Sequence, residues 1–440
     1  MTNPAARRRV AITGLGLVTP VGNDVETTWA SLLAGRSGGA PITQFDASGF
    51  TTRIAAEVKG FDDGQIERRL RKHTMRAHRF ALVAAEQALV DAGIRPTPET
   101  ATRWGLAVGA GMMTSEYPDL AALHAHSAPG GELDAARLLT DPSAHDPMIF
   151  TRSNANNGVA LLTKVHGIRG YATSVHTACA SGGQALGTAL KLIRRGAVDR
   201  VLAGGFDSMI SPVGLAGFCL LSAVSADNDT PERASRPFDA TRNGFLLGEG
   251  AGFLVLEEWE AARARGARVY AELAGDGNSL SSYRITDSPP DGDGPIQAMR
   301  AALADAGATP ADITYLNAHG TSTGMNDRSE SAATHAVFGG EVSRLSVSST
   351  KSSMGHLIAA AGAVEVAVCA LAIQRGEMPV NANYRVPDPD CALNLVLGAP
   401  RRQDVRMTMS NSFGFGGSNS CVVLRHPGLV DGGPVAAARR

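Results

Sequence analysis

Thr177-Ala-Cys179-Ala-Ser-Gly-Gly183 is the stretch of the chain that decides the fold. It follows the apolar Val175 and begins a helix of small residues that runs to Gly196, so a cysteine lies where a strand passes into a helix. Gly355-His356 begins a second such helix, which runs to Gly376. Two similar halves, each with a reactive side chain at a helix start, explain the repetition, and chance similarity of alanine-rich helices is the alternative.

Strand-like runs alternate with alanine-rich segments along the rest of the chain. The apolar spacing predicts a helix over 79–92 that stops at Gly93, and the same pattern recurs over 296–306. Such alternation favours a layered α/β fold over separate all-α and all-β domains. The predicted buried strands are 10–12, 106–108, 201–203, 252–256 and 421–424.

The internal repetition also predicts where the chain divides. We expect an N-terminal half at 1–260, a C-terminal half at 261–426 and a tail at 427–440, with the seam between Trp259 and Tyr270. The polar stretch 275–295 is predicted to be a surface loop of the second half.

Composition and charge exclude several classes of protein. The net charge of −1 gives no global electrostatic case for binding nucleic acid or a membrane surface, and no stretch approaches the roughly 20 apolar residues of a membrane span. Five cysteines lie singly, without a C-x-x-C pair, so neither a metal site nor a disulfide framework is expected. We therefore expect a cytoplasmic protein with reduced cysteines.

Cys179 is the strongest candidate for a nucleophile. The small residues around it give a substrate close access, and a helix starting there would aim free N–H groups and a positive dipole end at the sulfur. That placement lowers a thiol pKa. The alternative is a buried cysteine that acts as a small apolar side chain.

Two histidines and a glycine-rich segment complete the candidate site. His319 and His356 each lie beside a glycine, shortly after an apolar strand-like run, where α/β proteins gather ligand-binding groups. The segment 411–419 surrounds Phe415 with glycines, so that its N–H could donate to an oxyanion. Structural histidines and a glycine-rich turn between edge strands are the alternatives.

These ordered motifs resemble the β-ketoacyl-acyl-carrier-protein synthase family. Within it they are most similar to the type II synthases, in particular to 3-oxoacyl-acyl-carrier-protein synthase II. The resemblance spans nearly the whole chain and includes Ser235-Arg-Pro-Phe-Asp239 and Gly248-Glu-Gly-Ala-Gly252. It implies the thiolase fold, two similar halves in five α/β/α/β/α layers. It also implies a decarboxylating condensation with malonyl-acyl-carrier protein, in fatty-acid or type II polyketide biosynthesis.

The resemblance further implies roles for individual residues. Cys179 would accept the acyl group, and Phe415 with Gly416 would supply the oxyanion hole and the gate of the acyl pocket. His319 and His356 would bind the malonyl thioester and stabilise the enolate that decarboxylation leaves. The remaining implied residues are Lys351, which with Glu330 as its ion-pair partner would organise the histidines, and Met112, which would limit the acyl chain.

The family's partner is acyl carrier protein, whose phosphopantetheine carries the substrates, so no other cofactor is implied. Carrier proteins are acidic, and four basic residues occupy the position of a family docking element, although a solvated helix face is the alternative. Family members are usually dimers, so we expect a homodimer, and a heterodimer with a chain-length partner is the alternative. The basic residues are Arg68, Arg69, Arg71 and Lys72.

Departures from the family pattern leave the pathway open. Asn243 replaces a common aspartate, Ser222 replaces an arginine that often aids docking, and 281–284 reads Ser-Ser-Tyr-Arg. A noncatalytic chain-length partner is one rival reading, and intact Cys179 argues against it. A thiolase or serine acyltransferase acting on coenzyme A esters is another. Thiolases use a second cysteine late in the chain, where this sequence has Gly-Phe-Gly-Gly.

Overall fold

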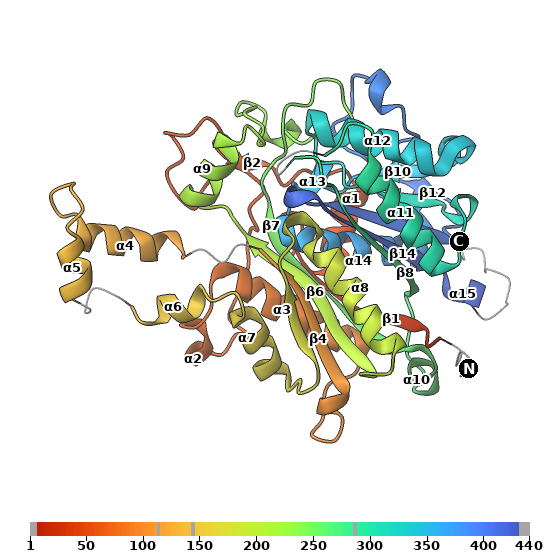
Figure 1. The fold of residues 1–440 in the computed structure, drawn as a ribbon, viewed down its shortest axis with the longest axis horizontal. Coiled ribbons are helices and arrows are strands. Elements are labelled where there is room, and N and C mark those ends of the chain that lie inside the picture. The colour runs from red at the N-terminus through yellow and green to blue at the C-terminus, as the bar shows by residue number, and fades with distance from the viewer. Residues whose placement is uncertain (1–6, 112–114, 142–145, 285–287, 431–440) are drawn as a thin grey trace.

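The computed structural model describes residues 7–111, 115–141, 146–284 and 288–430 (Figure 1). Its centre is a ten-stranded sheet that consists of two five-stranded parts. The parts meet where β1 (Val10–Val18) pairs briefly with β8 (Ala271–Leu280), through Ala11 with Glu272 and Ile12 with Ala271.

Both parts have the same strand order. The first reads β5 (Ala172–Val175), β4 (Trp104–Ala110), β6 (Arg200–Ser208), β7 (Glu249–Glu258), β1. The second reads β10 (Ser346–Ser348), β9 (Tyr315–Asn317), β13 (Met407–Phe413), β14 (Ser418–Arg425), β8. In each part the first three strands are parallel to one another, and the fourth strand is antiparallel to both of its neighbours, the third and the fifth. The two similar halves are therefore confirmed at the level of topology.

Helices form the other three layers. α8 (Ser181–Arg194) and α14 (Ala361–Arg375) lie between the two parts of the sheet, while α3 (Arg76–Ala92) covers the outer face of the first and α11 (Asp293–Ala306) that of the second. Successive side chains of a strand point to opposite faces of the sheet, so one strand contributes to two hydrophobic cores. In β14, Val422 and Leu424 pack toward the central helices, and Cys421 and Val423 pack toward α11. This is the expected five-layer arrangement.

The central helix α14 is almost entirely apolar. Ile358–Arg375 has the length and the mean hydropathy, 1.6, of a membrane span, contrary to the expectation that no stretch comes close to one. However, 89% of it is buried inside the protein, as befits a helix packed between two sheets.

The polar stretch at 275–295 is only partly the predicted loop. Its first residues belong to β8, and α11 begins at Asp293. A Cβ on Gly277 would lie 2.1 Å from the carbonyl oxygen of Ala298, and one on Gly275 would lie 2.5 Å from that of Ala302. These glycines therefore let α11 approach the strand. The loop prediction is wrong at both ends of the stretch, where polar residues belong to β8 and to α11.

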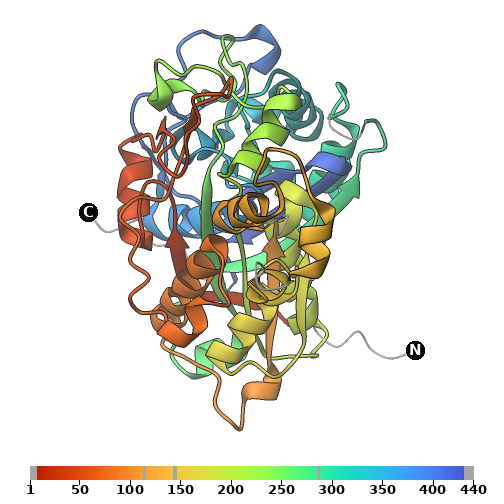
Figure 2. The same ribbon diagram turned by 90° about the vertical axis from the view of Figure 1, so that its left-hand side faces the viewer.

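The remaining elements surround this framework. In Figure 1 the segment that carries α4 and α5 projects to the left, and in Figure 2 it faces the viewer. The predicted helix 79–92 is confirmed inside α3, which starts three residues earlier and ends before Gly93 in the left-handed conformation. The other helices are α1 (Val25–Leu33), α2 (Arg68–Arg71), α4 (Tyr117–Ser127), α5 (Ala135–Thr140), α6 (Met148–Arg152), α7 (Asn157–His166), α9 (Pro212–Leu220), α10 (Trp259–Ala264), α12 (Gly324–Phe338), α13 (Lys351–Met354) and α15 (Pro427–Val430). Short strands are β2 (Ala40–Pro41), β3 (Ile54–Ala55), β11 (Glu377–Met378) and β12 (Arg401–Arg402).

Candidate active site

The first turns of α8 and α14 pack directly against each other. A Cβ on Gly182 would lie 2.8 Å from the backbone nitrogen of Ala363, and a Cβ on Gly362 would lie 2.7 Å from that of Gly183. Neither position has room for a side chain. The small residues after Cys179, predicted to give a substrate access, therefore bring the two helix starts together.

Cys179 lies in a short 3-10 turn, Ala178–Ala180, immediately before α8. Ala178 has a φ of +50°, a left-handed conformation that costs a non-glycine residue about 1–3 kcal/mol. The matching turn before α14, Ile358–Ala360, begins with Ile358 at a φ of +47°. The structural counterpart of Cys179 in the second half is therefore Ala359, three residues after His356.

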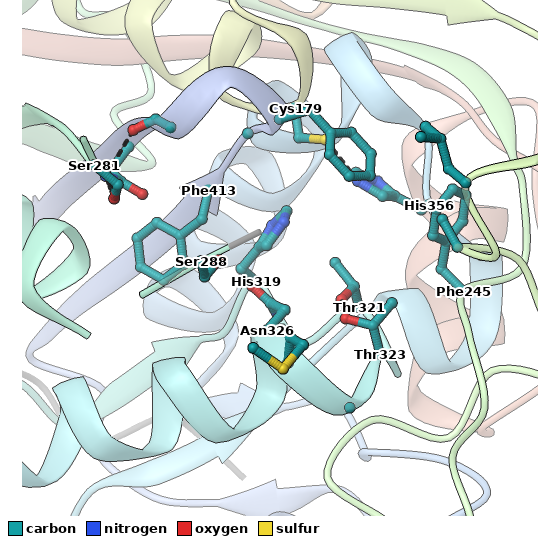
Figure 3. A pocket seen from close by; sticks show the side chains of 18 of the residues that line it. Cys179, Phe245, Ser281, Ser288, His319, Thr321, Thr323, Asn326, His356 and Phe413 are labelled. Atoms are coloured by element: carbon teal, nitrogen blue, oxygen red, sulfur yellow. Dashed lines mark hydrogen bonds between the residues drawn. The ribbon is translucent and has the colours of Figure 1, made fainter. Parts of the chain in front are cut away.

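His356 is hydrogen-bonded to the cysteine. Its Nε2 lies 3.0 Å from Sγ of Cys179, and its Nδ1 accepts from the backbone N–H of Ile358 at 3.2 Å (Figure 3). Because Nδ1 is an acceptor, the ring hydrogen is on Nε2 and points at the sulfur. Burial, together with the nearby charge of Lys351, keeps the pKa of His356 well below its usual value, so the ring is neutral.

His319 completes a compact group. Its ring meets that of His356 edge to face, with centroids 5.3 Å apart, and Figure 3 shows it beside Cys179. Burial, then Lys351, holds its pKa well below the usual value. The backbone N–H groups of His319 and Gly320 donate to the carboxylate of Glu330 at 2.8 and 2.7 Å, which fixes the chain at the end of β9.

The prediction that Lys351 forms an ion pair with Glu330 is wrong. Lys351 Nζ instead pairs with Glu365 of α14, and each of these two side chains is only 2% exposed. The oxygens of Glu330 are occupied by the strand-end N–H groups and by the amide of Asn411, at 2.9 Å. Glu365 was missed, although a lone carboxylate in the apolar helix 361–373 signals a buried ion pair.

The thiol pKa also differs from the expectation. Burial raises the pKa of Cys179 to about 12, against the lowering effect of Lys351 and of the backbone N–H groups of Phe415 and Cys179, which face the sulfur. Asp207 adds to the rise. The resting group is therefore the thiol, because loss of water outweighs the helix start.

The glycine-rich loop closes one side of this group. Phe415 is half-buried in a turn with Gly416 and Gly417, whose φ values are +80° and +83°. A Cβ on Gly414 would lie 3.3 Å from the backbone nitrogen of Cys179. The glycines thus allow the loop to run against the cysteine turn.

A cavity of about 300 Å³ leads from these residues to the surface. Cys179, His319, His356 and Phe415 line it, whereas Lys351 lies behind the histidines, buried. Met112 falls outside the described residues. Polar groups from three other segments also line the cavity: Ser281, Ser288, Thr321, Thr323 and Asn326.

The predicted docking residues lie elsewhere, on and after α2. Arg68, Arg69 and Lys72 are exposed, and Arg69 pairs with Glu67 at 2.5 Å. Arg71 is different, because its guanidinium donates to the carbonyl oxygens at positions 63 and 66, at 2.9 and 3.1 Å. Arg71 therefore stabilises the local fold, and its guanidinium is less available to a partner than the exposed side chains of Arg68, Arg69 and Lys72.

The group Cys179, His319 and His356 has ligand atoms within 4.8 Å of one another, close enough to hold a metal ion. For His356 to bind through Nε2 as a neutral ring, its hydrogen would move to Nδ1, where it would face the N–H of Ile358. The chemistry of this donor set therefore favours hydrogen-bond donation over metal binding.

Comparison with known proteins agrees with this geometry. Residues 7–262 match the family model "Beta-ketoacyl synthase, N-terminal domain", and residues 270–385 match "Beta-ketoacyl synthase, C-terminal domain". A 3-oxoacyl-[acyl-carrier-protein] synthase 2 from Coxiella burnetii is 40% identical over 421 residues, covering 95% of this chain and 98% of the relative.

Two solved structures are similar over their whole length. The ishigamide ketosynthase/chain length factor superposes with a TM-score of 0.85 at 37% identity, over 96% of this chain and 99% of that one. A type II PKS acyl-carrier protein in complex with its ketosynthase bound to the hexaketide gives 0.85 at 32% identity, over the same shares.

Proposed function

Since the chain belongs to the beta-ketoacyl synthase family, we propose that it is a 3-oxoacyl-[acyl-carrier-protein] synthase of fatty-acid or type II polyketide biosynthesis. An acyl group on Cys179 condenses with malonyl-acyl-carrier protein, releasing carbon dioxide and 3-oxoacyl-carrier protein. The single observation that carries this assignment is the 3.0 Å contact between Nε2 of His356 and Sγ of Cys179, across the junction of the two halves.

In the first half-reaction the sulfur of Cys179 attacks the acyl-carrier thioester. The carbonyl oxygen becomes an oxyanion, which the backbone N–H groups of Cys179 and Phe415 stabilise. The carrier sulfur leaves with the electron pair of the broken C–S bond. Because the resting cysteine is a thiol, its proton ends on the departing carrier thiolate, which leaves the site without a net charge.

In the second half-reaction the malonyl thioester oxygen lies against His319 and His356. Both rings are neutral and can donate an N–H, so they stabilise the enolate as carbon dioxide departs. The enolate carbon then forms a bond to the acyl carbon on Cys179. Collapse of the resulting oxyanion breaks the C–S bond, and the Cys179 thiolate takes a proton from water.

Other groups position these side chains. Lys351, which is paired with Glu365, places its ammonium group behind the histidines. Glu330 accepts from the backbone N–H of His319 and so holds the chain there. We assign the catalytic cysteine to the half 1–260 and the histidines to 261–426, with 427–440 as a tail. No cofactor other than the carrier's phosphopantetheine is needed, and the reaction takes place in the cytoplasm.

The partners follow from the same assignment. Acyl carrier protein docks on the basic residues of α2, and the chain acts as a dimer. Within the described part of the chain β5 is the last strand at one end of the sheet, and Leu133, Leu139 and Phe150 are exposed in the projecting segment around α4 to α6. Such edges and apolar side chains suit a second subunit, either a copy of this chain or a chain-length partner.

Mass spectrometry of the intact protein tests the assignment. Incubation with acyl-carrier thioesters of graded length should add the acyl mass to Cys179, and malonyl-carrier protein should then remove it with release of carbon dioxide. Cys179→Ala should gain no mass, while Cys391→Ala, which alters another buried cysteine, should behave as wild type. Absence of acylation at every length would disprove the assignment for the isolated chain.

A further inference from the structure

Arg328 stands out in the wall of the cavity. Among the described residues that line the cavity it alone carries a formal charge at neutral pH, since both histidines and Cys179 are neutral there. Cys179 is 2% exposed and Asn326 is 9% exposed, whereas the Arg328 side chain is 56% exposed. The cavity thus runs from a neutral inner end to a single cation at its mouth.

The backbone that carries Arg328 is firmly held. The guanidinium of Arg242 donates to the carbonyl oxygens of Thr323 and Gly324, at 3.1 and 3.3 Å, where α12 begins. Asp327 accepts from the backbone N–H groups of Phe238 and Ser322, at 2.8 and 3.2 Å. The first turn of α12 is therefore fixed against the neighbouring loop, and so is the point from which Arg328 projects.

The guanidinium itself is loosely held. Its nearest acid is Asp390, 3.3 Å away and 62% exposed, and exposed ion pairs of this kind bind weakly. A ligand that brings an anion to the mouth can take the place of Asp390. Arginine suits such a ligand because its planar donors pair with two phosphate oxygens at once.

The wall between the two ends carries no charge and combines apolar side chains, among them Phe245 and Phe413, with polar ones. Thr321, Thr323 and Asn326 lie beyond the histidines as seen from Cys179 (Figure 3), and the two threonine hydroxyls are 2.9 Å apart. Hydroxyl and amide groups suit a neutral amide chain. The whole cavity therefore matches a ligand with a thioester at its inner end, amides along its length and one anion at its outer end.

We propose that Arg328 binds the phosphate of the carrier's phosphopantetheine arm and so selects substrates that carry it. The inference rests on the proposed function, because it takes the thioester to be at Cys179. Arg328 would act on binding and would leave the chemistry at the sulfur unchanged.

The test compares two small thioesters, acyl-pantetheine and acyl-4′-phosphopantetheine, by the rate at which each acylates Cys179. Wild type should show a kcat/KM at least about tenfold higher for the phosphorylated thioester, the effect of a charge-assisted hydrogen bond. Arg328→Ala should lose that preference with unchanged kcat/KM for acyl-pantetheine, Arg328→Lys should keep part of it, and Asp390→Asn should increase it. With acyl-carrier protein, Arg328→Ala should raise KM and leave kcat unchanged.

Arg344→Ala is the matched control, because Arg344 is 82% exposed, pairs with Glu341 and lies beyond α12. It should keep the wild-type preference. A preference retained in Arg328→Ala, or lost equally in Arg344→Ala, would overturn the proposal while leaving the proposed function intact. Failure of both thioesters to acylate wild-type Cys179 would instead refute the proposed function, and this inference with it.

Discussion

Nε2 of His356 lies 3.0 Å from Sγ of Cys179, although 177 residues separate them in the chain. Each residue belongs to the turn region before a central helix of its own half. In the contact between those two helices, a glycine of each helix lies directly against the backbone of the other. The reactive contact is therefore a consequence of the repeated strand order, which brings equivalent turns together at the middle of the fold. Helix packing and site geometry should respond to the same substitutions.

Gly182→Ala tests this link. The added methyl would lie 2.8 Å from the nitrogen of Ala363 and 2.9 Å from the carbonyl oxygen of Ala359, so the helices must separate. We expect the free energy of unfolding, measured with urea, to fall by about 1–3 kcal/mol, and acylation of Cys179 to slow. Gly217→Ala, in helix α9 with nothing within 4 Å of its added methyl, should leave both unchanged or slightly increase stability.

The buried ion pair gives a second prediction. Glu365→Gln leaves the charge of Lys351 without its partner, which should cost about 3–5 kcal/mol of unfolding free energy. Lys351→Met combined with Glu365→Met should recover much of that stability but not condensation, because the charge behind the histidines is gone.

A double-mutant cycle identifies the partner of Lys351. The coupling free energy between Lys351 and Glu365 should exceed that between Lys351 and Glu330, since Glu330 instead accepts from the backbone at His319 and Gly320. Larger coupling to Glu330 would contradict the observed pairing.

The raised pKa of Cys179 predicts how stability depends on pH. The folded thiol keeps its proton up to about pH 12, while in the unfolded chain it ionises near its ordinary pKa of 9.0. Above pH 9 the unfolded state therefore binds fewer protons, and the unfolding free energy falls as the pH rises. Cys179→Ala should flatten this decline between pH 9 and 11 in urea titrations, relative to wild type. An unchanged slope would mean that the thiol is not protected by burial.

Sequence reasoning succeeded where one local pattern determines one feature. Strands appear as continuous apolar runs. Cys179 lies among small residues, and His319 and His356 each lie beside a glycine, at strand ends where α/β folds gather functional groups. It failed where the outcome depends on partners distant in the chain. Glu365 and Glu330 are both buried carboxylates near the site, and only packing decides which one reaches Lys351.

The same limit explains two other errors. The stretch that begins in β8 is polar and was predicted to be a loop, because the packing of α11 against its glycines involves residues more than 20 positions away. The pKa of Cys179 was expected to fall because the helix start is visible in the sequence, whereas the burial that raises it comes from both halves together.

The two histidines should be separable from the nucleophile. His319→Ala removes a donor to the malonyl oxygen but leaves the Cys179–His356 contact in place. We expect acyl transfer to Cys179 to continue at close to the wild-type rate, and carbon dioxide release from malonyl-carrier protein to fall by about 10²–10³-fold, the cost of one oxyanion donor. Intact mass and carbon dioxide release, measured on the same samples, check both halves of this statement.

Substituting His356 should have a different effect because its ring touches the sulfur. Loss of its Nε2–H should slow decarboxylation as His319→Ala does and also alter the rate of acylation of Cys179. His335→Ala, which removes an exposed histidine of α12, serves as the control and should match wild type in both assays. If His319→Ala and His356→Ala slowed acylation equally, the division of labour inferred from the 3.0 Å contact would be wrong, and both rings would act on the nucleophile.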